Sequence, residues 1–148
     1  MENHKRAKEL AYRFLARRAR SERELKEKLT RKGVKKETIE EVVDKLKEDG
    51  YLNDTTFAFD LARYLAVNKL WSDLKIAFYL KEKGIEEGTI TRAIEEARRE
   101  LSQREAVAQL VEKNRASDKY RLVNRLKARG FPLGLILEVI EDTTDEVK

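Results

Sequence analysis

Apolar residues recur at fixed positions around three glycines, Gly33, Gly84 and Gly130. An apolar residue stands eight and four positions before each glycine, and one, six, nine and ten positions after it. The members are Leu25, Leu29, Val34, Ile39, Val42 and Val43, then Ile76, Leu80, Ile85, Ile90, Ala93 and Ile94, then Leu122, Leu126, Phe131, Ile136, Val139 and Ile140. The glycines are 51 and 46 residues apart (84 minus 33, 130 minus 84), which is room for about three short helices. The pattern predicts a repeat protein.

We therefore expect an all-α fold of three tandem three-helix repeats that form an elongated, curved array. The repeats are expected over residues 1–52, 53–101 and 102–148. Each glycine is the expected C′ residue of a helix, because a left-handed residue there allows the apolar residue four positions before it to contact the one after it. Helix starts are expected at Ser21 and Ser102, each followed by a glutamate three residues later as in a capping box.

The segment Gly50-Tyr51-Leu52-Asn53-Asp54 joins the first two repeats. Gly50 is expected to end one helix and Asn53 to cap the next, with Asp54 in the positively polarised first turn. Leu52 and Phe57 then occupy the two positions of a hydrophobic staple. After Ile140 the chain is polar and acidic, so we expect it to fray there.

The composition excludes several classes of protein. The chain has no Cys, one His, one Pro and six Gly among 148 residues, so we expect neither a Cys/His metal site nor a thiol nucleophile. It also lacks an apolar run long enough to cross a bilayer or serve as a signal sequence. These observations favour a cytoplasmic, non-enzymatic protein without cofactors or membrane contact, and we expect a monomer.

Positive charge is concentrated towards the N-terminus. Residues 1–36 carry fourteen Lys/Arg against five Asp/Glu, or +9, whereas residues 37–148 carry nineteen against twenty-three, or −4. Arg6, Arg13, Arg17 and Arg20 have helical spacing, which predicts a basic ridge on the first helix opposite its Leu10 and Phe14 stripe. The candidate binding set adds basic neighbours and the next helix: Arg18, Arg23, Lys28, Arg31 and Lys32. Such a surface fits phosphates or an acidic protein, and a solvated helix face is the alternative.

Aromatic residues offer a second kind of candidate. Trp71 and Tyr79 could stack on unpaired bases, but burial in a helical core is the interpretation we favour for them. The residues interpreted as a structural signature of the repeats are Gly33, Gly50, Tyr51, Leu52, Asp54, Phe57, Gly84 and Gly130.

Several of these segments together resemble one protein family. They are residues 16–25 (Ala-Arg-Arg-Ala-Arg-Ser-Glu-Arg-Glu-Leu), Lys28-Leu29, Lys32-Gly33, the segment from Gly50 to Asp54 with Phe57-Ala58, and residues 80–85 (Leu-Lys-Glu-Lys-Gly-Ile). In order and spacing they look like the RecX family of bacterial recombinase regulators. Two departures are Asn53, where the family usually has an acidic residue, and Leu70-Trp71, where a smaller residue is expected.

The resemblance implies a partner and an activity. Proteins similar to this one bind the RecA–DNA filament in its helical groove and suppress its ATP hydrolysis, strand exchange and co-protease activity, which places them in DNA repair and the SOS response. The resemblance leaves groove occlusion and filament-end capping open. From the residues alone, direct single- or double-stranded DNA binding through the basic ridge remains the alternative.

Overall fold

The structure is a computed structural model that describes residues 2–147, with side chains from residue 3 to residue 143. Within that range the chain is helical, with no strand. The elements are α1 (Glu2–Arg17), α2 (Glu22–Arg31), α3 (Lys36–Glu48), α4 (Asp54–Arg63), the π-helical turn η1 (Tyr64–Asn68), α5 (Asp73–Glu82), α6 (Glu87–Glu100), α7 (Gln103–Lys113), α8 (Lys119–Ala128) and α9 (Leu133–Val147).

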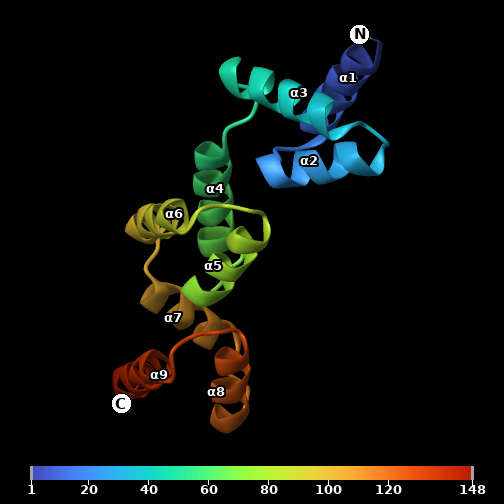
Figure 1. Cartoon of the computed structure of the whole chain (residues 1–148). Helices are drawn as coiled ribbons and strands as arrows, with labels where there is room; N and C mark the ends of the chain where they lie inside the picture. Colours follow the sequence, from blue (N-terminus) through green and yellow to red (C-terminus); the bar gives the residue numbers. More distant parts are fainter. Residues whose placement is uncertain (1, 148) are drawn as a thin grey trace.

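The helices form three successive groups along one elongated molecule (Figure 1). Helices α1–α3 lie at one end, α4–α6 with η1 in the middle, and α7–α9 at the other end. The N- and C-termini therefore lie at opposite ends of the molecule. This arrangement is the predicted array of three-helix repeats.

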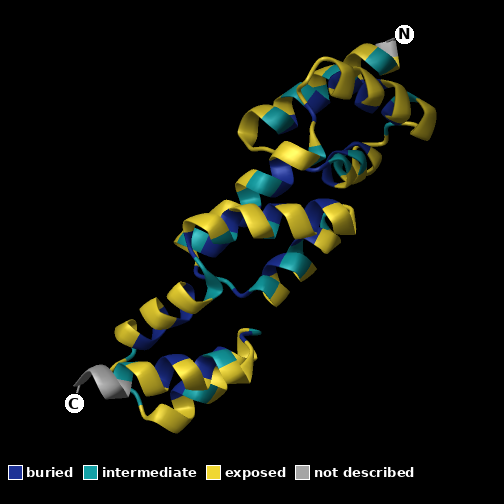
Figure 2. Cartoon of the chain, turned by 90° about the vertical axis from the view of Figure 1, so that its left-hand side faces the viewer, coloured by how far each residue is buried: buried dark blue, intermediate teal, exposed yellow. Residues whose placement is uncertain are grey.

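Each group has its own apolar core (Figure 2). The columns flanking the three glycines supply 16 of the 33 buried apolar residues, and Leu25, Ile76 and Ile136 have no exposed surface. The first helix of each group contributes small residues, such as Ala11, which is fully buried. Small residues allow the helices of a group to approach closely, which explains how repeats of about 50 residues (51 and 46 between glycines) each enclose a core.

The glycine endings have the predicted geometry. Gly33, Gly84 and Gly130 have φ values of 83°, 83° and 96°. The amide of Val34 donates to the carbonyl of Leu29 at 3.1 Å, and the amide of Gly33 donates to the carbonyl of Thr30 at 3.0 Å. These are the two hydrogen bonds of a Schellman motif. The same pair recurs at the two later glycines and at Gly50, so all four helices end by one mechanism.

The predicted helix starts are also present. Ser21 with Glu24, and Ser102 with Glu105, form complete capping boxes. The Asn53 side chain accepts hydrogen bonds from two amides of α4, so the family departure at Asn53 preserves the cap.

The predicted staple between Leu52 and Phe57 takes a different form. Both side chains are buried, but Leu52 belongs to the core of α1–α3 and Phe57 to that of α4–α6. The two residues that flank the linker therefore anchor it in separate cores. Tyr51 is 61% exposed, and its ring meets Tyr12 edge to face at a centroid distance of 5.3 Å.

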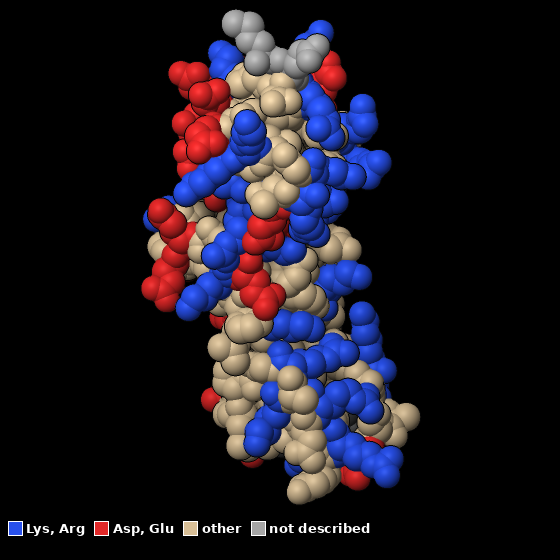
Figure 3. All heavy atoms as spheres, turned by 45° about the vertical axis from the view of Figure 1, so that its right-hand side comes forward, with Lys and Arg blue, Asp and Glu red and all other residues tan. Residues whose placement is uncertain are grey.

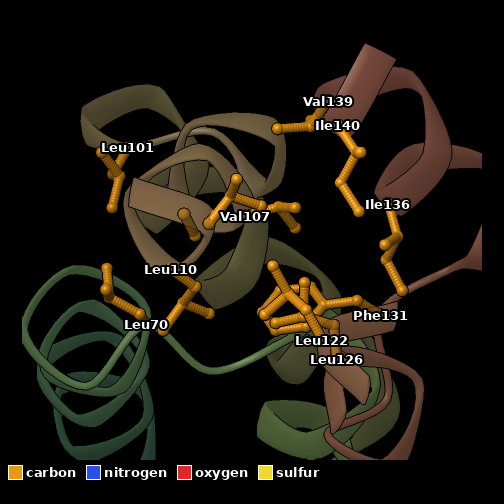
Figure 4. Close-up of a cluster of buried hydrophobic side chains, with 12 residues drawn as sticks. Leu70, Leu101, Val107, Leu110, Leu122, Leu126, Phe131, Ile136, Val139 and Ile140 are labelled. Atoms are coloured by element: carbon orange, nitrogen blue, oxygen red, sulfur yellow. The ribbon is translucent and has the colours of Figure 1, made fainter. Parts of the chain in front are cut away.

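The other family departure, Leu70-Trp71, lies just beyond the π-helical turn. Leu70 has a φ of 55°, which is rare for a branched side chain. Its side chain is 4% exposed and packs in the core of α7–α9, next to Leu110 (Figure 4). A residue of the second repeat thus completes the third core, and a smaller residue would leave a cavity there.

Fraying after Ile140 stays a prediction, and in the described range the backbone there is helical. Helix α9 continues through Val147. The Thr143 hydroxyl donates to the Val139 carbonyl at 2.8 Å, one helical turn back. Side chains from residue 144 onward, and all of Lys148, lie outside the described residues.

Candidate interaction surface

The second helices of the three repeats, α2, α5 and α8, form a row along one side of the molecule (Figure 1). The start of each helix meets the end of the next one. At the first junction an Arg23 Nη1 donates to the Glu82 carbonyl at 3.4 Å. At the second junction the Ser72 hydroxyl donates to the Arg129 carbonyl at 2.8 Å. We call this surface the second-helix row.

Both junctions also use one equivalent hydrogen bond. The amide of Glu22, at the start of α2, donates to the Asp54 carboxylate at 2.8 Å. The amide of Asp73, at the start of α5, donates to the Gln103 side-chain oxygen at 2.9 Å. Each acceptor is the first residue of the next repeat's first helix, so the signature residue Asp54 joins two repeats. Burial raises the pKa of Asp54, although this hydrogen bond opposes the rise.

A charged network around Glu24 also joins the first two repeats. Its carboxylate accepts from Arg18 at 2.7 Å and from Lys83 at 3.2 Å. Burial alone would raise the pKa of Glu24, but bonds from Arg18, the Ser21 amide and Lys83 outweigh it and lower that pKa to about 2. Arg18 is thus engaged in holding the fold, which differs from the free binding role predicted for it.

The prediction for Arg20 is wrong in two respects. Helix α1 ends at Arg17, so Arg20 does not extend a ridge on that helix. Its side chain is 6% exposed, Nε donates to the Phe14 carbonyl at 3.2 Å, and the guanidinium lies 5.8 Å from the Phe14 ring centroid. Sequence spacing carried the helix one turn too far, because the Ser21 cap requires an extended residue before α2.

The remaining ridge residues, Arg6, Arg13 and Arg17, are exposed and share a face of α1. None of them forms an ion pair within the described part of the chain. Their position needs one correction: at about 100° per residue, Arg13 lies beside the Phe14 stripe and not opposite it. The ridge therefore borders the core of the first repeat.

The predicted cations of α2 divide into free and engaged residues. Arg31 and Lys32 are exposed at the C-terminal end of the helix, where positive charge complements the helix dipole. Lys28 lies 5.0 Å from the Phe14 ring centroid. Arg23 lies at the first junction, with its Cβ close to Gly84. Arg31 and Lys32 thus join the ridge as accessible charges.

A second basic cluster, which the summed charge of residues 37–148 concealed, lies on and beside α8. Helix α8 carries four Lys/Arg and no Asp/Glu, and α9 carries five Asp/Glu and no Lys/Arg. The two helices cancel in a summed count, so counting by helix would have revealed them. The exposed cations of this cluster are Lys119, Arg121, Arg125, Lys127 and Arg129. Figure 3 shows Lys and Arg along the whole length of the molecule, with few acidic residues among them at the α8 end.

Trp71 and Tyr79 lie partly in the core of the second repeat, as we favoured, and not as open stacking platforms. Both are half-buried and pack against that core. Their rings meet edge to face at 5.4 Å, and Lys75 covers Trp71 with its ammonium 4.1 Å from the centroid.

The described residues contain no group of three or more His, Asp or Glu side chains placed to hold a metal ion. No helix in the described range is both long and apolar enough to cross a membrane. A hollow of about 720 Å³ is an open groove beside α2, lined by Arg23, Lys26 and Arg31 among others. The distinguishing features of the described surface are its charge and its length.

Fold and surface together define a helical-repeat protein with an extended, charged face. The first three-helix domain of RecX matches residues 7–46. The chain is 33% identical to Regulatory protein RecX of Caldanaerobacter subterraneus over 93% of this chain and 68% of that protein. It is also 33% identical to Regulatory protein RecX of Amycolatopsis mediterranei, over 98% of this chain and 87% of that one. The chain belongs to the RecX family.

Solved structures agree with the fold. The crystal structure of RecX from Lactobacillus salivarius superposes with a TM-score of 0.81 at 19% identity, covering 95% of this chain and 96% of that one. A crystal structure of regulatory protein RecX gives a TM-score of 0.80 at 22% identity, over 94% and 72%.

Proposed function

We propose that this protein is a non-catalytic regulator that binds the RecA–DNA filament as a monomer in the cytoplasm. Binding would inhibit RecA ATP hydrolysis, strand exchange and co-protease activity, and so act on DNA repair and the SOS response. The observation that carries the proposal is the second-helix row, a charged surface that spans three repeats. An elongated repeat array can contact several subunits of a helical polymer at once.

Two modes of inhibition fit this shape. Lying in the filament groove would block movement between subunits, whereas binding at a filament end would stop subunit addition. Both require only differential binding to one state of the filament, without chemistry on this chain. They differ in stoichiometry, because one molecule at an end affects a whole filament and one molecule in a groove affects only its neighbours.

The test is single-strand-dependent ATP hydrolysis by RecA, titrated with this protein. Inhibition by amounts far too small to cover the filament supports end capping, and inhibition that increases in proportion to filament coverage supports groove occlusion. Absence of inhibition at saturation would refute the proposed function. Bare single-stranded DNA binding, measured in parallel, shows whether the loss of activity arises from competition for DNA.

Direct nucleic-acid binding remains a second candidate function because of the α8 cluster. Its cations have no acidic residue on their own helix, which favours a polyanion. A variant with Arg121→Gln and Lys127→Gln is expected to bind bare DNA more weakly and with a shallower salt dependence. The matched variant, Arg13→Gln with Arg17→Gln, removes the same charge from the ridge. Equal loss in both variants would mean that only net charge matters.

A further inference from the structure

Helix α5 of the middle repeat exposes two large apolar side chains to solvent. Leu74 is 69% exposed and Phe78 is 64% exposed. They lie four residues apart, so they are neighbours on one face of the helix. Water contact of this extent is unfavourable for both side chains, and adjacent exposed apolar residues typically mark an interaction site.

The other two repeats share this feature only in part. At the position of Leu74, ten before the repeat glycine, α8 has Tyr120, which is 75% exposed, and α2 has Arg23. The residues at the position of Phe78, six before the repeat glycine, are Glu27 in α2 and Asn124 in α8. Both residues are polar and exposed. The fold therefore accepts a polar residue at this position, and Phe78 is not required for the packing of a second helix.

Cations surround the apolar pair. Lys75 and Lys81 flank it on α5 and are exposed. Arg129 lies beyond the N-terminal end of the helix, where its carbonyl bonds to Ser72. At the C-terminal end, Arg23 reaches the Glu82 carbonyl. Cations thus outnumber acidic residues around the pair, with Glu82 and Glu27 lying near Arg23 at the C-terminal end of α5.

We propose that this face of α5 docks an amphipathic, acidic segment of a protein partner, with Phe78 and Leu74 as the apolar anchor. The inference rests on the proposed function, in which that partner is the RecA filament. An apolar centre within a charged rim is the usual anatomy of an energetically dominant contact. The basic rim selects an acidic segment and orients it.

Two other occupants fit less well. Bare nucleic acid would bind α8 in preference to α5, because α5 carries equal numbers of acidic and basic residues, two of each. Leu74 also has no ring on which a base could stack. A second copy related by a twofold axis through Phe78 would bring Lys75 of each copy towards Lys81 of the other, and like charges oppose such a contact.

The test replaces Phe78 by the residue that the third repeat has at the same position, Phe78→Asn. Because the repeats supply a polar precedent, the fold and its melting temperature are expected to stay unchanged. The matched control is Leu137→Asn, which removes a 41% exposed leucine from the acidic helix α9. Binding is measured against RecA assembled on single-stranded DNA with a non-hydrolysable ATP analogue, and inhibition by ATP hydrolysis.

Phe78→Asn is expected to raise the concentration for half-inhibition at least tenfold, whereas Leu137→Asn changes it less than twofold. Lys81→Glu is expected to weaken binding several-fold and to reduce its salt dependence. Wild-type inhibition in Phe78→Asn would overturn the docking site while leaving the proposed function intact. Failure of the wild-type protein to inhibit RecA would refute the proposed function itself.

Two further results would assign the face to another occupant and overturn the proposal. One is an equal loss of bare single-stranded oligonucleotide binding in Phe78→Asn, which would indicate base stacking. The other is a wild-type dimer in sedimentation velocity that Phe78→Asn converts to a monomer. We expect a monomer in both proteins and unchanged oligonucleotide binding.

Discussion

The glycines that end the second helices experience two different environments. A Cβ on Gly33 would meet nothing within 4 Å, whereas one on Gly84 would lie 2.8 Å from the Arg23 Cβ. Both residues have a φ of 83°, so both avoid the strain that an L-residue would incur. Gly84 is also required by the packing of one repeat on another, and so is Gly130, where a Cβ would lie 2.7 Å from the Ser72 Oγ.

Alanine substitutions are expected to separate these two requirements. Gly33→Ala should destabilise by about 1 kcal/mol through backbone strain alone. Gly84→Ala should cost more, by roughly a further 1 to 2 kcal/mol, because the new methyl group displaces Arg23. Urea unfolding of both variants measures the difference. Equal losses of unfolding free energy in the two variants would show that Arg23 can move away from the new methyl group without destabilising the junction.

Leu70 combines backbone strain with burial, and two substitutions separate these effects. Leu70→Ala should destabilise by about 2 to 4 kcal/mol because it leaves a cavity in the third core. Leu70→Gly loses the same contacts but relieves a φ of 55°. Glycine, which usually costs about 1 kcal/mol relative to alanine in regular structure, should here be equal to or better than alanine. Thermal unfolding gives the order of stability of the two variants. A glycine variant clearly less stable than the alanine variant would show that Leu70 is not strained.

At the scale of elements, charge at the first junction stabilises the contact between α2 and α5. The Glu24 carboxylate must be ionised to accept from both Arg18 and Lys83, which come from different repeats. Its pKa is about 2 in the folded chain and 4.5 ordinarily. Because folding lowers this pKa, the stabilisation is present above about pH 4.5 and is lost as the pH falls towards 2.

Glu24→Gln is expected to flatten this pH dependence. Glutamine preserves the capping box but cannot titrate. Because Arg18 is half exposed, solvent screens its ion pair, and the pH-dependent part of the free energy of unfolding should be of order 1 to 2 kcal/mol. Urea unfolding between pH 2.5 and pH 5.5, with the wild-type chain beside the variant, checks it. The pKa of Asp54 is raised, so its effect on the free energy of unfolding changes with pH in the opposite direction. The wild-type chain and the variant both contain Asp54, so its effect is the same in both. If the free energy of unfolding varied with pH in the same way in both proteins, Glu24 would contribute nothing to the pH dependence.

At the scale of the whole molecule, stability is expected to vary along the array. The middle repeat is covered on one side by α2 and on the other by α7 and α8, whereas each terminal repeat has one neighbour. Nearest-neighbour coupling in repeat proteins then predicts slowest amide exchange in the middle repeat, especially α4 and α6. Hydrogen exchange measured by mass spectrometry tests this order, and uniform protection would indicate that the three repeats unfold together.

Much of this architecture was predictable because its causes are local. The glycine endings and serine caps depend on residues within one helical turn, so a single sequence reveals them. The role of Asp54 across a junction depends on Glu22, which is 32 residues away. Arg18 and Arg20 bond to residues only six positions away, but they do so across the break between α1 and α2. Periodicity alone does not bring such pairs together. The α8 cluster was missed because α9 cancels its charge in a summed count.

The amide bonds from Glu22 to Asp54 and from Asp73 to Gln103 also determine how the molecule could change in length. Because each repeat orients its successor through the same kind of bond, duplication of residues 53–101 would add a further unit without a new type of contact. The reach of the protein would then increase in steps of one repeat. The area of partner surface that the protein covers would then depend on the number of repeats, and gene duplication would change it in steps where substitution would change it gradually.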